Sequence, residues 1–546
     1  MAEKKHVEFH PRQPEEMTKP FSIFGRIDPV VFIISAVFIF AIIAWGLLDN
    51  ESMSARMGTA LSWTLDYGGW YYMGIVFIFV VFCFFMAFSK YGDVKFGGPD
   101  DEPEFGVFSW FSMLFGCGMG VGLVFWSVAE PMYHYLSGPT YAGKPGSVSA
   151  AEFSMAISFF HWAISAWAIF VVVGIPMGLI IYRRGLPTLM SSIFYPLIGD
   201  RIYGPIGKAI DIFALIGTFF GMCTTIGLGS MQLVSGLNFN WPSIEANDTT
   251  YMIVMVVVTA GYLASACLPI DRGIKNGSNA SMVAVIALLV FIMIVGPTVY
   301  ILNNFVNATG LYIQYFPRMS MWMDPVEQTG WLSSWTIFYW AWWISWGPFV
   351  GIFIAKISKG RTIREFVLAS MIAPSIFCMI YFSIYGSAAL SQHMDKATNG
   401  ILYKTISEDV ARAIYVLFAE YPGISVVGII LLFICYTFFV VSADAACIVM
   451  AMLASGGDPS PRATHKILWG VAMAVSASML ILSGGLNALQ TLNIVMAFPL
   501  AIIMGFAMWA TVKMLHRDFA HEFRGAAVKK FVDEHVAKKA ADETAA

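Results

Sequence analysis

The chain has 546 residues, of which 58% are hydrophobic and only 12% are charged. A soluble domain usually carries about 25% charged residues, so this composition excludes an ordinary water-soluble enzyme and predicts a polytopic membrane protein. The net charge of −3 gives no indication of a nucleic-acid partner. The seven cysteines lie inside apolar runs without metal-type spacing and predict neither a disulfide framework nor a metal cluster; they are Cys83, Cys117, Cys223, Cys267, Cys378, Cys435 and Cys447. The polar first 20 residues lack the apolar core of a cleavable signal peptide.

Twelve apolar runs are long enough to cross a bilayer, which takes roughly 20 residues per helix. The sequence therefore predicts an all-α integral membrane protein with twelve transmembrane helices. The predicted spans are 28–48, 69–89, 107–136, 151–182, 206–236, 250–269, 281–301, 332–357, 365–390, 425–454, 463–483 and 493–515.

Lysine and arginine are unevenly shared between the two sets of loops that these spans define. Of the 32 basic residues, the predicted external loops hold only Arg56, Lys144, Arg318, Lys396, Lys404 and Arg412, and the rest lie on the side of the two termini. The positive-inside rule places both termini in the cytoplasm, and two termini on one side require an even number of spans.

Three segments outside the spans also have recognisable patterns. The external segment 302–331 contains the partly amphipathic stretch Phe305–Phe316, which suits a helix along the membrane surface, and a second such stretch is Ser407–Ala419. The charged tail from Lys513 predicts a helix over Glu522–Lys539. It is either a solvated helix or a regulatory arm that contacts anionic lipid through Lys529, Lys530, Lys538 and Lys539.

Glycine and proline interrupt two of the spans. The third span contains Gly116-Cys-Gly-Met-Gly-Val-Gly122, and each glycine costs about 1 kcal/mol against alanine in a helix. Either the glycines permit close helix packing, or the segment is unwound and its backbone lines a cavity, as in transporter sites. Ser345-Trp-Gly-Pro348 interrupts the eighth span, five spans later. Breaks at matching places predict two inverted five-helix repeats, spans 3–7 and 8–12.

Aromatic residues gather at two places inside the membrane. In Phe338–Phe349 four tryptophans fall within seven residues: Trp340, Trp342, Trp343 and Trp346. In span 4, Trp167 and Phe170 share a helix face, with Trp162 on its flank. Dense aromatic faces suit a cation without hydrogen-bond donors, such as a quaternary ammonium group.

Three polar residues within the spans need their own interpretation. His161 is expected to be a hydrogen-bonded packing residue rather than a proton relay. Glu130, near the outer end of span 3, is expected at the membrane interface. Asp444 in span 10 is expected either to bond a nearby helix N-terminus or hydroxyl or to bind an ion, because intramembrane carboxylates are functional candidates.

These motifs together resemble one family. The GMGVG segment, HWAISAWAIF (161–170), IGLGSMQ (226–232), FYWAWWISWGPFVGIFIAKISKGRTIREF (338–366) and SADAA (442–446) are similar to the betaine/choline/carnitine transporters, over roughly residues 25–515. The resemblance implies a LeuT-type fold with the two inverted repeats, often assembled as a homotrimer. It implies a small-molecule substrate with an onium head, glycine betaine-like or dimethylsulfoniopropionate-like, and no enzymatic activity, cofactor or nucleic-acid partner.

The resemblance also implies roles for individual residues. The substrate site would comprise Trp162, Trp167, Phe170 and Trp343 as an aromatic cage, together with Met119, Gly120 and Gly122 of the glycine segment. The transport pathway would include Phe125, Trp342, Trp346 and Phe349. The betaine symporters of the family have tyrosine where Phe170 stands, so the exact onium substrate stays open among glycine betaine, dimethylsulfoniopropionate, choline and carnitine.

Sodium is the coupling ion that the resemblance implies. One sodium site would use Gly116, Met119, Phe438 and Ser442, although Val441 replaces a second hydroxyl residue. A second site near Phe349 would use Thr218, although Met222 replaces another threonine. Proton-coupled choline carriers tend to have an acidic residue where Gly122 stands, which favours sodium here.

The expected function is secondary active uptake of an onium zwitterion across the cell (inner) membrane by sodium symport, for osmoprotection. Sodium-independent exchange and proton coupling are alternatives, as are a neutral amino-acid carrier of this fold and a ligand-gated channel or receptor with an aromatic cage. The expected organisation is a cytoplasmic segment 1–27, two additional spans 28–106, the first repeat 107–301, an external linker 302–331, the second repeat 332–515 and a cytoplasmic tail 516–546.

Overall fold

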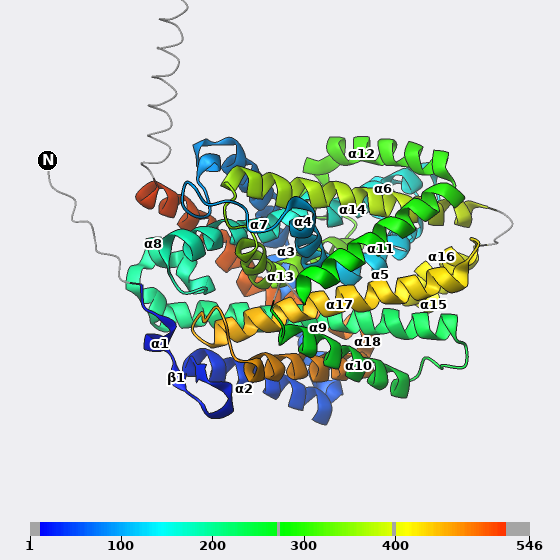
Figure 1. The fold of residues 1–546 in the computed structure, drawn as a ribbon. Helices are drawn as coiled ribbons and strands as arrows, with labels where there is room; N and C mark the ends of the chain where they lie inside the picture. Colours follow the sequence, from blue (N-terminus) through cyan, green and yellow to red (C-terminus); the bar gives the residue numbers. More distant parts are fainter. Residues whose placement is uncertain (1–10, 270–272, 396–399, 520–546) are drawn as a thin grey trace, which may run out of the picture.

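A computed structural model describes residues 11–269, 273–395 and 400–519, apart from the side chains of 483–486. Within these residues the protein is a bundle of long helices (Figure 1), and its strands are the short antiparallel pair β1 (Lys19–Pro20) and β2 (Arg26–Ile27). The predicted tail helix Glu522–Lys539 and its lipid-binding lysines lie outside the described residues, as do Arg272 and Lys396.

The twelve predicted spans are confirmed, counting one bent pair of helices as a single span. In chain order they are α2 (Pro29–Leu48), α3 (Asn50–Phe88), α4 (Val107–Gly118) with α5 (Gly120–Ser137), α6 (Val148–Trp162) with α7 (Ile164–Leu179), α9 (Pro205–Asn240), α10 (Asp248–Ala266), α11 (Ile274–Val295), α13 (Phe338–Lys356), α14 (Ile363–Met394), α17 (Ile424–Ala454) and the two parts of α18 (Ala463–Asp518). Further helices join them: α1 (Pro14–Met17), α8 (Tyr195–Ile198), α12 (Thr298–Met321), α15 (Ile401–Glu408) and α16 (Ala413–Ala419).

The long α18 supplies the last two spans, Ala463–Leu482 and Asn487–Asp518. Met479 lies against Gly46, close to the end of α2, whereas His516 is 3.0 Å from the hydroxyl of Tyr91, just beyond the end of α3. Because α2 and α3 follow one another in opposite directions, these contacts lie at opposite ends of the bundle. The second part of α18 therefore runs back toward the end at which the first part begins.

Burial sorts the helices into a centre and a periphery. Every residue of α13 from Phe338 to Ala355 is buried, whereas only 28–39% of the residues in the apolar windows of α2, α10 and α11 are buried. A helix that is apolar on all sides can lie either in a protein core or against lipid, so hydropathy could not rank these helices. The tryptophan-rich stretch of the sequence is thus the middle of the molecule, surrounded by α7, α9 and α18.

The predicted break in span 3 is confirmed. α4 ends at Gly118, α5 begins at Gly120, and the two axes differ by 67°. Gly120 has a φ of +38°, a region that residues with a side chain avoid. The glycine pattern therefore marks a bend in the backbone as well as close packing.

The predicted break at Ser345–Pro348 is wrong, because α13 continues through it as an α-helix. Pro348 removes one backbone hydrogen bond but the surrounding buried side chains hold the helix together, as membrane helices allow. The irregular part of this span lies earlier, in a π-helical turn at Ser333–Ile337. A second break lies in span 4, where Ala163 (ψ −130°) separates α6 from α7.

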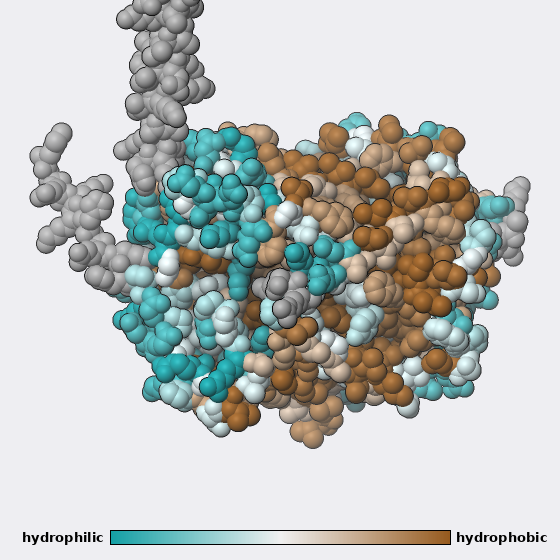
Figure 2. Space-filling model, viewed as in Figure 1, coloured by the Kyte–Doolittle hydropathy of each residue, from teal (hydrophilic) through white to brown (hydrophobic). Residues whose placement is uncertain are grey.

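Both described ends of the chain lie at one end of the bundle, at the left of Figure 1. The backbone N–H of Asp28 donates to the carbonyl of Ala454 at the end of α17, and Arg184 forms an ion pair with Asp518. Hydrophilic residues gather at this end, whereas hydrophobic residues cover the middle of the face shown in Figure 2. The arrangement agrees with two termini on one side of a membrane.

The two predicted amphipathic segments are helical. Phe305–Phe316 falls within α12, which buries one stripe of its surface, Ile301, Asn304, Ala308 and Tyr312, mainly against α6 and α14. The second stretch, Ser407–Ala419, is divided instead of continuous. Asp409 is extended (φ −148°, ψ 98°), ends α15, and accepts a hydrogen bond from the backbone N–H of Ala411 at 3.0 Å.

Candidate functional site

The four predicted cage rings come together at the centre of the bundle. The ring centroids of Trp162 and Trp343 are 5.0 Å apart, those of Trp343 and Phe170 6.3 Å, and those of Trp167 and Phe170 5.7 Å. All three pairs meet edge to face, a favourable arrangement for aromatic rings. All four side chains are fully buried, so the rings of α6, α7 and α13 enclose this region away from solvent.

The break in span 4 helps to fix this arrangement. Trp162 is the last residue of α6, and the carbonyls of a final helical turn lack partners within the helix. The carbonyl of His161 accepts a hydrogen bond at 3.1 Å from the indole N–H of Trp343. Trp343 also stacks on Trp342, with centroids 4.8 Å apart and ring planes 12° apart. The position of Trp343 is therefore fixed at its edge and on one face.

The glycine segment lies directly against these rings. A Cβ atom on Gly118 would lie 2.9 Å from the ring of Trp167, and one on Gly122 would lie 2.8 Å from Trp342 and 3.2 Å from Trp162. Gly120 faces a different neighbour, because a Cβ atom placed on it would lie 2.6 Å from the hydroxyl of Ser442. Gly122 thus lies against Trp162 and Trp342, and Gly120 lies against Ser442. Met119 is the residue at the bend.

Three further rings border the cage without having been predicted from the sequence. The ring centroids of Tyr339 and Phe382 each lie 5.4 Å from that of Trp162, and the ring centroid of Phe115 lies 6.2 Å from that of Trp167. Tyr339 belongs to the tryptophan-rich stretch itself, but the sequence did not indicate that its side chain points toward Trp162. Phe115 precedes the glycines by one residue, and Phe382 comes from α14.

The predicted pathway residues of α13 lie along the helix α9. The indole N–H of Trp342 donates to the hydroxyl of Thr225 at 3.2 Å, and that of Trp346 donates to the carbonyl of Gly221 at 3.3 Å. Phe349 continues this row, 5.3 Å from Trp346. Phe125 on α5 is buried, and its ring lies beside that of Trp126, with ring centroids 5.0 Å apart.

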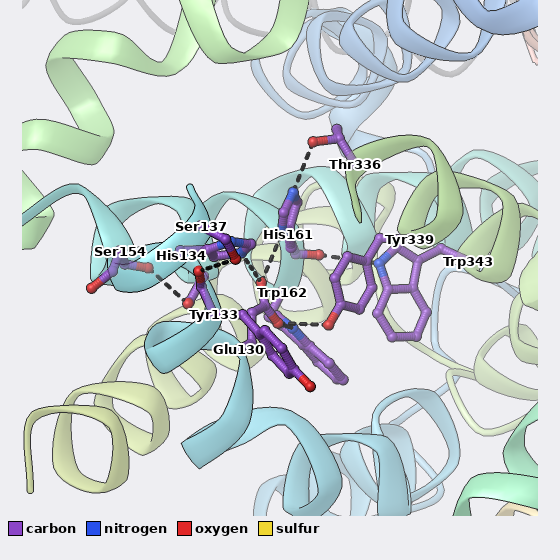
Figure 3. Close-up of polar contacts among 11 residues, drawn as sticks. Glu130, Tyr133, His134, Ser137, Ser154, His161, Trp162, Thr336, Tyr339 and Trp343 are labelled. Atoms are coloured by element: carbon purple, nitrogen blue, oxygen red, sulfur yellow. Dashed lines mark hydrogen bonds and ion pairs between the residues drawn. The ribbon is translucent and has the colours of Figure 1, made fainter. Parts of the chain in front are cut away.

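Glu130 lies inside the protein, and its predicted place at the membrane interface is wrong. Its side chain is 0% exposed, and Figure 3 shows the side chains that surround it. One oxygen, Oε2, accepts from the indole N–H of Trp162 and the hydroxyl of Tyr339, both at 2.6 Å. The other, Oε1, is 2.7 Å from Nδ1 of His161 and 3.2 Å from Nε2 of His134.

This cluster of hydrogen-bonding side chains explains why the carboxylate of Glu130 is tolerated inside the protein. A buried carboxylate is costly unless it is hydrogen-bonded, and here donors from α5, α6 and α13 surround it. His161 also contacts the hydroxyl of Thr336 at 2.9 Å, which agrees with its expected role as a hydrogen-bonded packing residue. Glu130 accepts from both Trp162 and Tyr339, so the cluster links this ring of the cage to α13.

Residues predicted for the first ion site lie around Gly116. The hydroxyl of Ser442 lies 3.1 Å from the carbonyl oxygen of Gly116, and the carbonyl of Phe438 lies 3.7 Å from the position of a Gly120 Cβ atom. Val441, which lacks a hydroxyl, lies beside Gly116. Ser278 of α11 also lies there, with its Oγ 3.2 Å from the position of a Gly116 Cβ atom and no hydrogen-bond partner among the described residues.

Ser278 is a residue that the sequence did not single out. Hard cations prefer oxygen ligands, and its hydroxyl stands beside the position at which Val441 removes one. Ser278 therefore adds a second hydroxyl beside Gly116, in addition to the hydroxyl of Ser442 and the carbonyl of Gly116.

The second predicted ion site is less complete. Contacts pair Trp342 with Thr225 and Trp346 with Gly221, so the antiparallel course of α9 and α13 brings Thr218 to the level of Phe349. The hydroxyl of Thr218 is buried and has no partner within the described residues. Met222, one turn later on α9, supplies a thioether instead of an oxygen, and it is a poor ligand for a hard cation.

Asp444 makes a structural contact. Its Oδ2 accepts a hydrogen bond from the hydroxyl of Ser265, near the end of α10. The bond joins α17 to α10. This contact favours the first of the two roles expected for Asp444, a bond to a nearby hydroxyl.

Comparison with known proteins agrees with this architecture. The family of betaine/carnitine/choline transporters matches residues 30–520. A probable glycine betaine transporter of Desulfitobacterium hafniense is 42% identical over 494 residues, which cover 90% of this chain and 98% of that protein. The glycine betaine transporter OpuD of Bacillus subtilis is 40% identical over 482 residues, 88% of this chain and 92% of that protein.

A third relative has a broader name. The betaine/ectoine transporter LcoP of Corynebacterium glutamicum is 36% identical over 502 residues, which cover 91% of this chain and 79% of that protein. Family and relatives alike are transport proteins, and none of these names describes an enzyme. The chain belongs to the betaine/carnitine/choline transporter family.

Proposed function

We propose that this transporter takes up glycine betaine, or a zwitterion with a similar onium head, by sodium symport. The observation that carries the proposal is the meeting of Trp162, Trp167, Phe170 and Trp343 beside the broken span. The names of the relatives from Desulfitobacterium and Bacillus support glycine betaine in particular. The name of the Corynebacterium relative also includes ectoine, so ectoine is a further candidate substrate.

The cage matches the chemistry of the onium head. A trimethylammonium group has no conventional hydrogen-bond donor, so a polar pocket gains little from it. An aromatic face contributes about 0.5–2 kcal/mol to a desolvated cation. Several such faces together offset the cost of removing water from the diffuse charge.

The bend in span 3 suits the other end of the zwitterion. The first backbone N–H groups of α5 lack carbonyl partners within the helix and carry its positive dipole end. In transporters with broken helices, such helix starts face anionic substrate groups. The carboxylate of glycine betaine would therefore lie at Gly120–Gly122, and its ammonium head would lie among the rings.

Sodium coupling rests on the oxygen atoms near Gly116. The hydroxyl of Ser442 and the carbonyl of Gly116 are within 3.1 Å of each other, and α4 ends with its negative dipole toward this region. A cation bound there would stabilise the bend that also holds the substrate. It can drive uptake only through different affinities for the outward-facing and inward-facing states.

The cellular setting forms part of the same proposal. Lysine and arginine dominate the loops on the side that holds both termini, which supports cytoplasmic termini in the cell (inner) membrane. Assembly as a homotrimer and a role in osmoprotection are the expectations that follow from the family. Sodium-independent exchange and proton coupling are the competing modes for the same cage.

Uptake by the purified full-length chain in proteoliposomes tests the proposal. We expect saturable accumulation of radiolabelled glycine betaine that requires an inward sodium gradient, because one charge moving through 100 mV supplies about 2.3 kcal/mol. Choline, carnitine and dimethylsulfoniopropionate serve as competitors. Equal initial rates after replacement of sodium by potassium would exclude symport, and flux without accumulation would indicate a channel.

The sodium site has its own test in Ser442→Ala. Loss of the hydroxyl is expected to raise the sodium concentration for half-maximal uptake at least about tenfold, since a hydrogen bond or ligand to a charged group is worth about 1.5–3 kcal/mol. The maximal rate at saturating sodium should change far less. Ser476→Ala, which removes a buried hydroxyl on α18, is the matched control, and the same sodium dependence in both variants would place the ion elsewhere.

A further inference from the structure

Glu130 is a buried acid whose charge has no fixed cationic partner. Among the described residues, its ion-pair partners are the two histidines His134 and His161, and no lysine or arginine faces it. The indole N–H of Trp162 can only donate, so Oε2 must accept from it. An ionised carboxylate accepts from all four neighbours at once when His161 carries its hydrogen on Nδ1 and His134 on Nε2, and we take Glu130 in this form.

The carboxylate lies on the outer edge of a cage wall. Oε2 is 2.6 Å from the nitrogen of Trp162, and the ring of Trp162 meets Trp343 at 5.0 Å. A hydrogen bond to an ionised acceptor is short and strong, and it polarises its donor. Electron density moves from the N–H into the indole ring, and the attraction of a ring face for a cation is electrostatic. The charge also acts directly through a medium of low dielectric constant.

We propose that Glu130 is the fixed negative charge of the substrate site. It acts through Trp162 as a positioning and polarising residue, and it makes the cage select a positively charged head over a neutral group of the same shape. An onium head in the cage completes the charge pair that the protein leaves open. The inference rests on the proposed function and adds the cause of discrimination by charge.

Discrimination by charge is tested with a pair of ligands that differ in one heavy atom. Glycine betaine and 3,3-dimethylbutanoate have the same shape and the same carboxylate, but the latter has carbon in place of the ammonium nitrogen. The ratio of their affinities, measured by competition for uptake and by tryptophan fluorescence, reports recognition of charge separately from fit. Wild-type protein is expected to prefer glycine betaine by at least about 30-fold.

Glu130→Gln removes the charge and preserves the shape. The amide oxygen can accept from Trp162 and Tyr339, and the amide NH₂ can donate to His161 in its other tautomer, with Nε2–H turned to Thr336. We expect the preference for glycine betaine to fall about tenfold or more, while the affinity for 3,3-dimethylbutanoate changes less than threefold. A preference equal to that of wild type, or equal losses for both ligands, would overturn the proposal.

Two further variants separate charge from geometry. Tyr339→Phe removes one of the hydrogen bonds to Oε2 and keeps the charge, and Glu130→Asp keeps the charge with a shorter reach. Both should retain a preference close to that of wild type even where both affinities fall, and a tenfold lower preference in either would overturn the charge role. These variants also keep the test decisive if Glu130→Gln fails to fold. A wild-type protein that binds both ligands equally, or neither, would instead overturn the proposed function.

Discussion

Trp343→Ala is expected to reduce glycine betaine uptake to background while the protein still reaches the membrane. The substitution removes the ring that joins α13 to the cage wall of α6, 5.0 Å from Trp162. Loss of one desolvated cation–π face of about 2 kcal/mol corresponds to roughly a 30-fold loss of affinity. It also removes the partner on which Trp342 stacks at 4.8 Å, so the neighbouring part of the pathway is disturbed as well.

The matched control lies on the same helix. Trp340 is also fully buried, but its ring packs on Phe160 and His161, with ring centroids 5.1 Å and 6.0 Å away. Trp340→Phe and Trp343→Phe make equal changes at the two positions, and only the second should raise KM for glycine betaine. Uptake kinetics, with expression measured in parallel, show whether Trp343 contributes to substrate binding. A normal KM and maximal rate for Trp343→Ala would show that this residue is not part of the cage.

The spans were predictable because membrane insertion depends on length and composition. About 20 consecutive apolar residues carry that signal locally, so most predicted boundaries fall within a few residues of the helices. α3 is the largest exception, because it begins at Asn50 instead of near residue 69. Its polar first turns extend beyond the apolar run and carry no hydropathy signal.

Breaks in the helices were predictable only in part. The four glycines around Met119 remove side chains from consecutive turns, and the bend of 67° lies among them. Pro348 carries a similar local signal, but tertiary packing of a fully buried helix overrides it. The break at Ala163 has no glycine or proline to mark it, because it is held by contacts such as the bond from Trp343 to the carbonyl of His161.

The cage rings were predicted as a set, and their supporting residues were not. Trp162, Trp167 and Phe170 share one short stretch, so their spacing already indicates that they lie close together. Glu130 is 32 residues from Trp162 and 209 from Tyr339 along the chain. Hydropathy and spacing contain no information about such contacts, and a carboxylate near the end of a span favours the interface when only the sequence is considered.

Gly120→Ala is expected to abolish coupled transport through the backbone. Gly120 begins α5 with a φ of +38°, and residues held in such sparsely populated regions cost about 1–3 kcal/mol. The added methyl group would also lie 2.6 Å from the hydroxyl of Ser442, closer than side chains can approach. Either the bend changes or Ser442 leaves the carbonyl of Gly116, and both outcomes separate the ion site from the cage.

The control and the readout distinguish this effect from general helix disturbance. Gly74 lies in α3 with no heavy atom within 4 Å of a Cβ position, so Gly74→Ala should leave uptake unchanged and stabilise the helix by up to about 1 kcal/mol. For Gly120→Ala we expect less than about a tenth of wild-type uptake, together with loss of the sodium effect on glycine betaine binding in tryptophan fluorescence. Normal sodium-dependent binding in that variant would show that the left-handed residue at the bend is dispensable, and that the ion and substrate sites are coupled by another route.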